Sequence, residues 1–273
     1  MPHSQWMRYF SPTFQHRRLG LVCLGVGLQS GNLPTVGPRR LDHHVAVVVT
    51  RGRGWFSHGG RPPQAVSAPV LLWLVPGVEH HYAPEPGTGW DECFVDFTGP
   101  GVEAYADLGY VTPQCPVVPL RETAEVQHIV DGIVRAARRD SPLLHVEAAA
   151  AVHALLVALR YARLEVTRQG EAVMEALARD ALLPISVAEH AARLGMPLAE
   201  LRGVVRRITG EGVKEYLLGI RLDRAKELLV RTDLPVAGVA RRVGYEDASY
   251  FSRLFSRRVG VAPVRFRDQR QGR

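Results

Sequence analysis

The feature of this sequence that most limits its fold is an internal repeat in the C-terminal part. The segment AEHAARLG (188–195) matches AGVARRVG (237–244) and shares Ala, Ala, Arg and Gly with it. Each copy continues, after a short turn, into a second segment that ends in Gly, over 198–210 and 247–260. Helix, tight turn and helix is the pattern of a helix-turn-helix motif. The sequence therefore predicts two such motifs, with a plain helical bundle carrying a chance repeat as the alternative.

The second helix of the later copy has two chemically different faces. Phe251, Leu254 and Phe255 have the spacing of a buried face, and we expect them to pack onto the preceding helix at Val236, Val239 and Val243. The opposite face holds hydroxyl and cationic side chains without an acidic partner: Ser249, Ser252, Arg253, Ser256 and Arg257. Between the two copies, residues 216–231 form a predicted connecting helix with its own apolar side.

Positive charge is concentrated in the same region. The 273-residue chain has a formal net charge of +7, and from residue 170 onward it holds 19 Lys and Arg against 13 Asp and Glu. Residues 1–169 hold 15 against 14. One module that binds a polyanion would explain this distribution, and a well-solvated basic surface is the alternative.

The N-terminal part has the pattern of a β domain. Short β-branched runs over 45–56, 68–77 and 90–101 end in Gly- or Pro-containing turns, which predicts an all-β sandwich or barrel up to about residue 120. Two strongly helical segments follow, over 121–140 and 145–166. These helices could form a dimer interface or pack on the β domain.

The segment 221–267 closely resembles the C-terminal signature of the AraC/XylS family of bacterial transcription regulators. It carries the trailing pattern G-x-x-P-x-x-[FY]-R as Gly260, Pro263, Phe266 and Arg267. The N-terminal part resembles the cupin-like, sugar-sensing domain of that family in three stretches: RGRGWF (51–56), PGVEHHY (76–82) and W-x-x-x-x-V-x-F (90–97).

The resemblance implies an α+β architecture and a regulatory function. We expect a cupin-like β sandwich or barrel that senses a ligand over 1–120, a helical linker with possible dimerisation helices over 121–169, and an all-α domain with two helix-turn-helix motifs over 170–273. The implied function is sequence-specific DNA binding that responds to a small molecule, for example a sugar or polyol. The expected partners are double-stranded promoter DNA, the effector, RNA polymerase and a second copy of the chain.

The resemblance also implies DNA-binding residues. The base-reading positions of the second motif fall on Ala248, Ser249, Ser252 and Arg253, with Arg257 nearer the DNA backbone. The first motif departs from the family pattern, because Pro197 replaces a serine N-cap and Gly203 replaces an arginine. We therefore expect the second motif to supply most discrimination and the first mostly affinity, through residues of its second helix: Ala199, Arg202, Arg206 and Arg207.

By the same resemblance, the ligand-contacting positions of the β domain are Tyr82, Glu92 and Phe94, with an arginine from Arg39 or Arg40. The family has His and Trp where this chain has Glu92 and Phe94. If Glu92 faces the pocket, it suits a hydroxyl-rich or cationic ligand better than a carboxylate.

A metal-dependent cupin enzyme fused to a DNA-binding domain is the alternative function. Adjacent histidines on a strand point to opposite faces, so His43-His44 and His80-His81 each offer one ligand to an interior metal. We therefore expect no catalytic residues, metal or other cofactor. Three widely spaced cysteines suggest neither a zinc site nor a disulfide framework. The apolar run over 19–28 is too short to span a membrane, which favours a cytoplasmic protein without a membrane partner.

Overall fold

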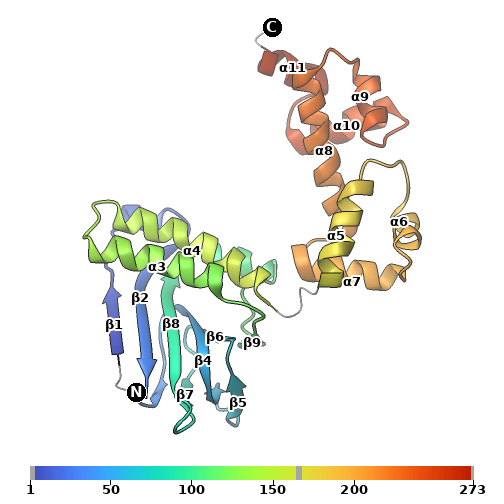
Figure 1. Cartoon of the computed structure of the whole chain (residues 1–273). Helices are drawn as coiled ribbons and strands as arrows, with labels where there is room; N and C mark the ends of the chain where they lie inside the picture. The colour runs from blue at the N-terminus through green and yellow to red at the C-terminus, as the bar shows by residue number, and fades with distance from the viewer. Residues whose placement is uncertain (1–3, 164–167, 272–273) are drawn as a thin grey trace. The chain divides into compact units, whose positions relative to one another are not determined.

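The computed structural model describes residues 4–163 and 168–271, and the chain divides into two compact units, 1–165 and 166–273 (Figure 1). The first unit is mainly β and the second is helical. The segment expected to link them over 121–169 is divided between the units. Its two helices, which end at residue 161, belong to the first unit, residues 164–167 lie outside the described residues, and residues 168–169 begin a helix of the second unit.

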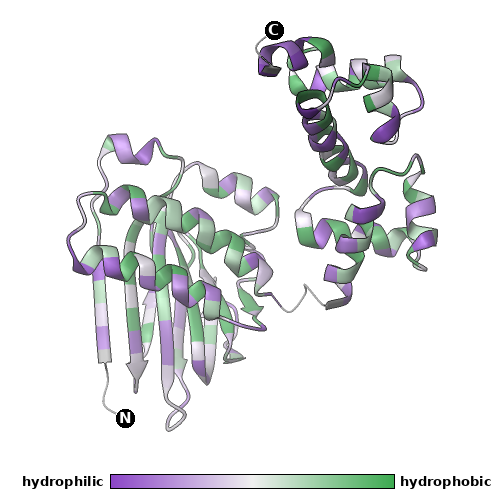
Figure 2. Ribbon diagram, turned by 45° about the horizontal axis from the view of Figure 1, so that its top comes forward, coloured by the Kyte–Doolittle hydropathy of each residue, from purple (hydrophilic) through white to green (hydrophobic). Residues whose placement is uncertain are grey.

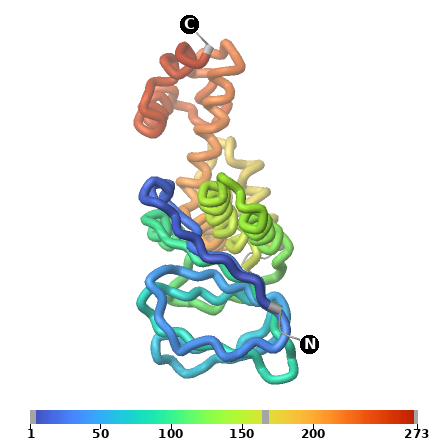
Figure 3. The backbone as a smooth tube through the Cα atoms, turned by 90° about the vertical axis from the view of Figure 1, so that its left-hand side faces the viewer, coloured from blue at the N-terminus to red at the C-terminus, as the bar shows by residue number. Residues whose placement is uncertain are grey.

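The first unit is built on antiparallel strands that pair in the order β1-β2-β8-β4-β6-β9. The strands are β1 (Ser4–Tyr9), β2 (Val22–Gly31), β3 (Val36–Arg39), β4 (His44–His58), β5 (Gln64–Ser67), β6 (Val70–Leu74), β7 (His80–Pro84), β8 (Trp90–Thr98) and β9 (Val117–Pro119). Two short helices, α1 (Phe14–Arg17) and α2 (Gly101–Asp107), lie between strands in the sequence. Seen in Figure 3, the strands curve around an oval, as in a barrel.

The long strand β4 connects the two sides of this barrel. Its first half pairs with β6 and β8, and its second half pairs with β5 and β7. Strand β7 also pairs with β3. Side chains alternate along β4, because successive residues of a strand point to opposite faces. Val45, Val47 and Val49 face the barrel interior, while Ala46 and Val48 join the cluster under the helices. Burial on both faces explains why this strand is an almost continuous apolar run.

Helices α3 (Ala124–Arg138) and α4 (Leu144–Tyr161) cover one face of the sheet (Figure 1). Their apolar residues share one buried cluster with Val26 of β2 and with Val95 and Phe97 of β8. Of the two arrangements left open by the sequence, packing on the β domain is therefore the one observed. Helix α4 is also long and apolar enough to cross a membrane by composition, but half of it is buried here, which is common in core helices.

The second unit contains two similar helical halves joined by one long helix. Its helices are α5 (Arg168–Asp180), α6 (Val187–Arg193), α7 (Leu198–Thr209), α8 (Val213–Arg231), α9 (Val236–Arg242), α10 (Ala248–Val259) and α11 (Pro263–Gln271). Hydrophobic and hydrophilic residues alternate along these helices in Figure 2, as expected of amphipathic helices around small cores.

Each half has its own hydrophobic core, and α8 contributes to both. Val213 and Leu217 near its start belong to the core of α5, α6 and α7. Leu222, Ala225 and Leu229 farther along belong to the core of α9 and α10. The helix-turn-helix repeat is thus α6-turn-α7 and α9-turn-α10, and the predicted fold class is confirmed.

Candidate nucleic-acid interface and ligand site

Helix α10 has well-defined ends. Asp247 caps its N-terminus, because one carboxylate oxygen accepts hydrogen bonds from the backbone N–H groups of Ser249 (2.7 Å) and Tyr250 (3.0 Å). These two bonds stabilise the charged carboxylate and lower the pKa of Asp247 below its ordinary value. The helix ends at Gly260, whose φ of 87° is in the left-handed region that glycine adopts without strain.

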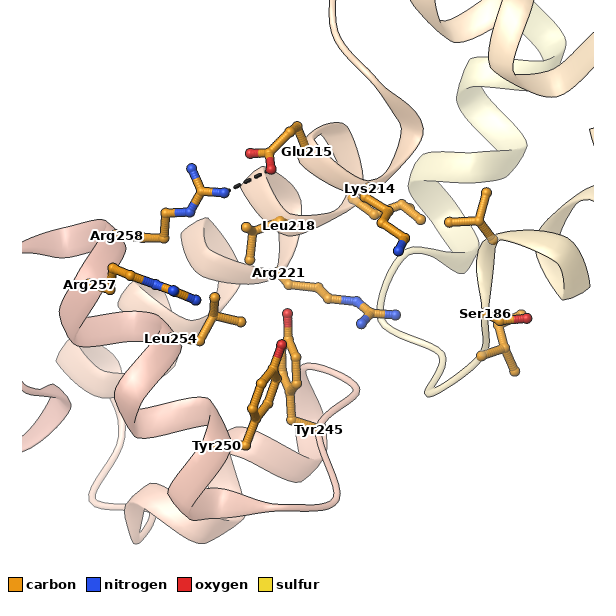
Figure 4. Close-up of a pocket in the computed structure, with 13 residues that line it drawn as sticks. Ser186, Lys214, Glu215, Leu218, Arg221, Tyr245, Tyr250, Leu254, Arg257 and Arg258 are labelled. Atoms are coloured by element: carbon orange, nitrogen blue, oxygen red, sulfur yellow. Dashed lines mark hydrogen bonds and ion pairs between the residues drawn. The ribbon is translucent and has the colours of Figure 1, made fainter. Parts of the chain in front are cut away.

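The apolar face of α10 is buried as the sequence predicts. Phe251 and Phe255 are fully buried in one cluster with Val239 of α9 and with Val243, which directly follows α9. Leu254 is also buried, but it lines a cleft together with Leu218 of α8 (Figure 4). This packing fixes the rotation of α10, so that its opposite face is directed to solvent.

That opposite face carries the predicted DNA-binding residues of the second motif. Ser249, Arg253 and Arg257 are exposed, and Ala248 and Ser252 are partly exposed. The Ser252 hydroxyl donates to the carbonyl oxygen of Ala248 at 2.8 Å, and Ser256 donates to that of Ser252 at 2.8 Å. The structure thus brings the five predicted residues of α10 to one accessible surface.

Helix α7 differs from α10 at its start and in its middle. Its N-cap, Pro197, makes no side-chain capping bond, as the sequence predicts. A Cβ atom added at Gly203 would lie 3.3 Å from a guanidinium nitrogen of Arg207, so the arginine one turn later lies over the glycine. The predicted contacts Ala199, Arg202, Arg206 and Arg207 are all exposed.

The turns of the two motifs also differ. Four residues, 194–197, separate α6 from α7, whereas five residues, 243–247, separate α9 from α10. The extra residue in the second motif places Asp247 at the N-cap, where the first motif has Pro197. The second helix of the second motif therefore has the better-defined N-terminus.

Arg221 of α8 connects the two halves of the second unit. Its Nε donates to the carbonyl oxygen of Ala181 at 2.7 Å and an Nη donates to that of Leu183 at 2.6 Å, both before α6. Its guanidinium also lies 5.3 Å from the ring centroid of Tyr245, in the turn before α10. At Gly244 a Cβ atom would lie 2.7 Å from the carbonyl oxygen of Leu182, so the two halves approach each other closely there.

The barrel interior contains three of the predicted ligand residues. Tyr82 and Glu92 are buried, and the Tyr82 hydroxyl donates to Glu92 Oε1 at 3.2 Å. Trp90 Nε1 donates to Glu92 Oε2 at 2.7 Å, and Gln29 donates to Oε1 at 3.1 Å. Burial raises the pKa of Glu92, while the bonds from Trp90 and Tyr82 oppose that rise. Phe94 lies in the same interior cluster.

The two candidate arginines have different surroundings. Arg39 Nε donates to His80 Nε2 at 3.1 Å, and its charge lowers the pKa values of Glu92 and Asp96 against the effect of burial. Both arginines are exposed, but Arg40 lies beside Glu79, with 3.6 Å between the charged groups. The geometry therefore groups Arg39, and not Arg40, with the interior residues.

Asp96 is an interior residue that the sequence-based site omitted. It lies two residues after Phe94 on β8, is 4% exposed, and has a pKa raised by burial. His43 Nε2 lies 3.3 Å from Asp96 Oδ1, but Asp96 Oδ2 has no hydrogen-bond partner among the described residues. A Cβ atom at Gly25 would lie 2.7 Å from that oxygen, so the glycine leaves it room. The alternation of Glu92, Phe94 and Asp96 was the signal that could have identified it.

The histidine pairs are divided between faces as strand alternation predicts. His43 approaches Asp96, whereas His44 stacks on Phe97 on the side of the helices. His80 bonds to Arg39, whereas the ring of His81 contacts Trp55. Within residues 4–163 and 168–271, no three His, Cys, Asp or Glu side chains converge as a metal site would require.

Comparison with known proteins gives matches to both units. The family model of the AraC-like ligand binding domain matches residues 28–159, and a helix-turn-helix domain model matches residues 190–269.

Individual relatives cover either part or most of the chain. The HTH-type transcriptional activator RhaR of Enterobacter sp. (strain 638) is 46% identical over 69 residues, which is 25% of this chain and about a quarter (24%) of RhaR. The MmsAB operon regulatory protein of Pseudomonas aeruginosa is 28% identical over 85% of this chain and 78% of its own length. The arabinose operon regulatory protein of Salmonella typhimurium is 28% identical over 84% of this chain and 85% of its own length.

Replacing His80 should change how the stability of the protein depends on pH. Burial lowers the pKa of His80 from 6.5 to about 4, so the unfolded chain takes up this proton first as the pH falls. The free energy of unfolding therefore decreases between about pH 6.5 and 4, by at most about 1.4 kcal/mol per pH unit for one group. In His80→Gln, the loss of stability from pH 7 to pH 5, measured by urea denaturation, should be smaller than in the wild type. The exposed His128, changed to Gln, is the control, and an equal loss in wild type and His80→Gln would contradict the prediction.

Proposed function

This chain belongs to the AraC/XylS family of DNA-binding transcription regulators, and we propose that it binds promoter DNA under the control of a hydroxyl-rich small molecule held in the barrel. The observation that carries the proposal is that one chain contains two units with different chemistry. One has two helix-turn-helix motifs with solvent-facing arginines, and the other encloses buried carboxylates beside aromatic rings. The protein would act on DNA in the cytoplasm.

In this proposal, α7 and α10 each enter a segment of the major groove. Because both motifs belong to one unit, α7 and α10 reach segments of the major groove about one helical turn apart, roughly 10 bp. Arg253 is the main base-reading residue, because arginine bonds bidentately to guanine. The residues Ala248, Ser249, Ser252 and Arg257 of α10, and Ala199, Arg202, Arg206 and Arg207 of α7, complete the contact surface.

A sugar or polyol is the effector class that the barrel suits best. Such a ligand offers hydroxyl donors to buried carboxylate oxygens, and Asp96 Oδ2 is such an acceptor without a partner among the described residues. The rings of Tyr82 and Trp90 stack with 6.3 Å between their centroids and form an aromatic wall beside Glu92. Glu92 already accepts three hydrogen bonds, so in this proposal Asp96 is the first acceptor to meet the ligand. The relative named for the arabinose operon supports the same class.

A homodimer through α4 is part of the proposal. The exposed side of this helix carries apolar residues three or four positions apart, a spacing that favours packing against a second helix. These residues are Leu143, Val146, Ala150, Ala154, Val157 and Tyr161. The activator name of the RhaR relative supports activation, and hence contact with RNA polymerase.

Two substitutions test the division of work between the motifs. Arg253→Ala should abolish the difference in affinity between cognate and scrambled DNA, because it removes the main contact with bases. Arg202→Ala should weaken binding to cognate and to scrambled DNA by about the same factor, because it removes a phosphate contact. Titrations by fluorescence anisotropy at fixed salt measure both effects. The reverse pattern would contradict the proposed roles.

Ligand screening by thermal melting tests the effector class. Sugars or polyols should raise the melting temperature of the wild type, and the shift should be reduced in Asp96→Asn, which keeps the shape but loses the charge. Cys115→Ser, at an exposed position, should respond like the wild type. Stabilisation by an aromatic acid alone, without any response to sugars, polyols or amines, would count against the proposal.

The oligomeric state tests the role of α4. Val157→Glu places a charge in the apolar stripe and should shift the protein from dimer to monomer in analytical ultracentrifugation. Gln127→Glu adds the same charge at an exposed position of α3 and should leave the sedimentation unchanged. A wild type that sediments as a monomer at micromolar concentration would contradict the dimer.

A further inference from the structure

The second unit contains a cleft of about 430 Å³ between its two helix-turn-helix motifs (Figure 4). Its walls come from the start of α6, the first half of α8, the turn at Tyr245, and α10. Of the predicted DNA-binding residues, Arg257 lines it. Leu218 and Leu254 form an apolar part of the wall, and the hydroxyl groups of Tyr245 and Tyr250 point into the space beside Arg221.

The lining is strongly cationic. Lys214, Arg221, Arg257 and Arg258 face it together with a single carboxylate, Glu215. Glu215 Oε1 accepts a bond from Arg258 at 2.7 Å, so its charge is already compensated within the cleft. Because Arg258 balances Glu215, the other three cations are left in excess, which makes the cleft attractive to an anion.

Two of these cations are available to a ligand. The donors of Arg221 are directed to the carbonyl oxygens of Ala181 and Leu183. By contrast, no ion pair or hydrogen bond joins the side chain of Lys214 or of Arg257 to another described residue. A phosphate that enters the cleft would therefore meet an ammonium and a guanidinium group without displacing an existing partner.

The position of Lys214 does not serve the stability of its own helix. It lies in the first turn of α8, where the helix dipole disfavours a cation. The chain has only one other lysine, Lys226, which lies on the same helix and pairs with Asp223 at 3.0 Å. The unpaired cation at the start of α8 is better explained by a ligand than by helix stability.

The cleft is continuous with the predicted DNA-binding face. Arg257 follows Arg253 by four residues, so the two side chains are neighbours on α10, one turn apart. Tyr250 directly follows Ser249 of that face. If α7 and α10 occupy successive segments of the major groove, a DNA strand crosses between them, and the cleft lies between the two motifs.

We propose that this cleft binds a phosphate group of the DNA backbone, in the stretch of strand between the two major-groove segments. The Lys214 ammonium, the Arg257 guanidinium and the Tyr250 hydroxyl are donors suited to phosphate oxygens, and the leucines contact the adjoining sugar. The inference rests on the proposed function, and it adds a contact that holds the strand between the two reading helices.

Salt-dependent affinity tests the contact. The probe is a duplex selected by the wild-type protein from random sequence, with a scrambled duplex beside it. Lys214→Gln should weaken binding to both duplexes by a similar factor, about five- to tenfold near 0.1 M salt. It should also reduce the magnitude of the slope of log affinity against log salt concentration by about 1. Lys226→Gln removes the same charge from the same helix outside the cleft and should change neither quantity.

Neutral methylphosphonates, placed singly between the two groove segments, locate the phosphate. At one position, the methylphosphonate should weaken binding of the wild type by the same factor as Lys214→Gln does. In the Lys214→Gln variant, the methylphosphonate at that position should cause no further loss of affinity. An unchanged salt slope in Lys214→Gln, with normal wild-type binding, would overturn the inference alone. A wild type that selects no DNA sequence would overturn the proposed function, and the inference with it.

A free anion is the other source of phosphate, and thermal melting distinguishes it. If inorganic phosphate or a phosphate monoester stabilised the wild type but not Lys214→Gln, while the salt slope for DNA stayed the same, the cleft would be a small-anion site and the DNA assignment would be wrong. If neither compound stabilised the wild type at millimolar concentration, and the slope decreased in the variant, the DNA backbone would be the source.

Discussion

The guanidinium group of Arg221 is the contact on which the arrangement of the second unit most depends. It binds two backbone carbonyls before α6 and stacks on Tyr245 before α10, so one side chain connects both helix-turn-helix motifs to α8. Hydrogen bonds that use a charged donor are stronger than neutral ones, and breaking the bond to the buried Ala181 would take that partner from its carbonyl oxygen. Arg267 plays a similar part at the C-terminal end, where its guanidinium donates to the carbonyls of Leu229 and Leu234. Two residues of the segment that resembles the family signature are thus structural.

The helical unit could be predicted well from the sequence because its information is local. The spacing of Phe251 and Phe255 identifies the buried face of α10, and the glycine at 260 marks its end within one turn. The weaker start of α7 also follows from one residue, Pro197. The contact of Arg207 with Gly203 could not be read in this way, because it depends on how a long side chain folds back along the helix.

The polar interior of the barrel was only partly predictable, because it depends on the register between distant strands. Alternation along β8 places Glu92, Phe94 and Asp96 on one face, but it does not say which partners they meet. Those partners come from β2, β4 and β7 and from the loop before β4, at sequence separations of up to 63 residues. The choice between Arg39 and Arg40 was open for the same reason, since a shift of one residue in β3 exchanges the faces.

If α10 contacts bases as proposed, the hydrogen bonds of its serine hydroxyls affect which bases it can recognise. Ser252 and Ser256 each donate their hydroxyl hydrogen to a carbonyl oxygen one turn earlier, which leaves their outward lone pairs as acceptors. In the major groove only the amino groups of adenine and cytosine are donors. An α10 that keeps these internal bonds would therefore favour an adenine or cytosine amino group opposite the serines. Arg253, next to Ser252, favours a guanine, because it donates to guanine acceptors. Neighbouring positions of one helix would thus select a hydrogen-bond donor on one base and hydrogen-bond acceptors on another.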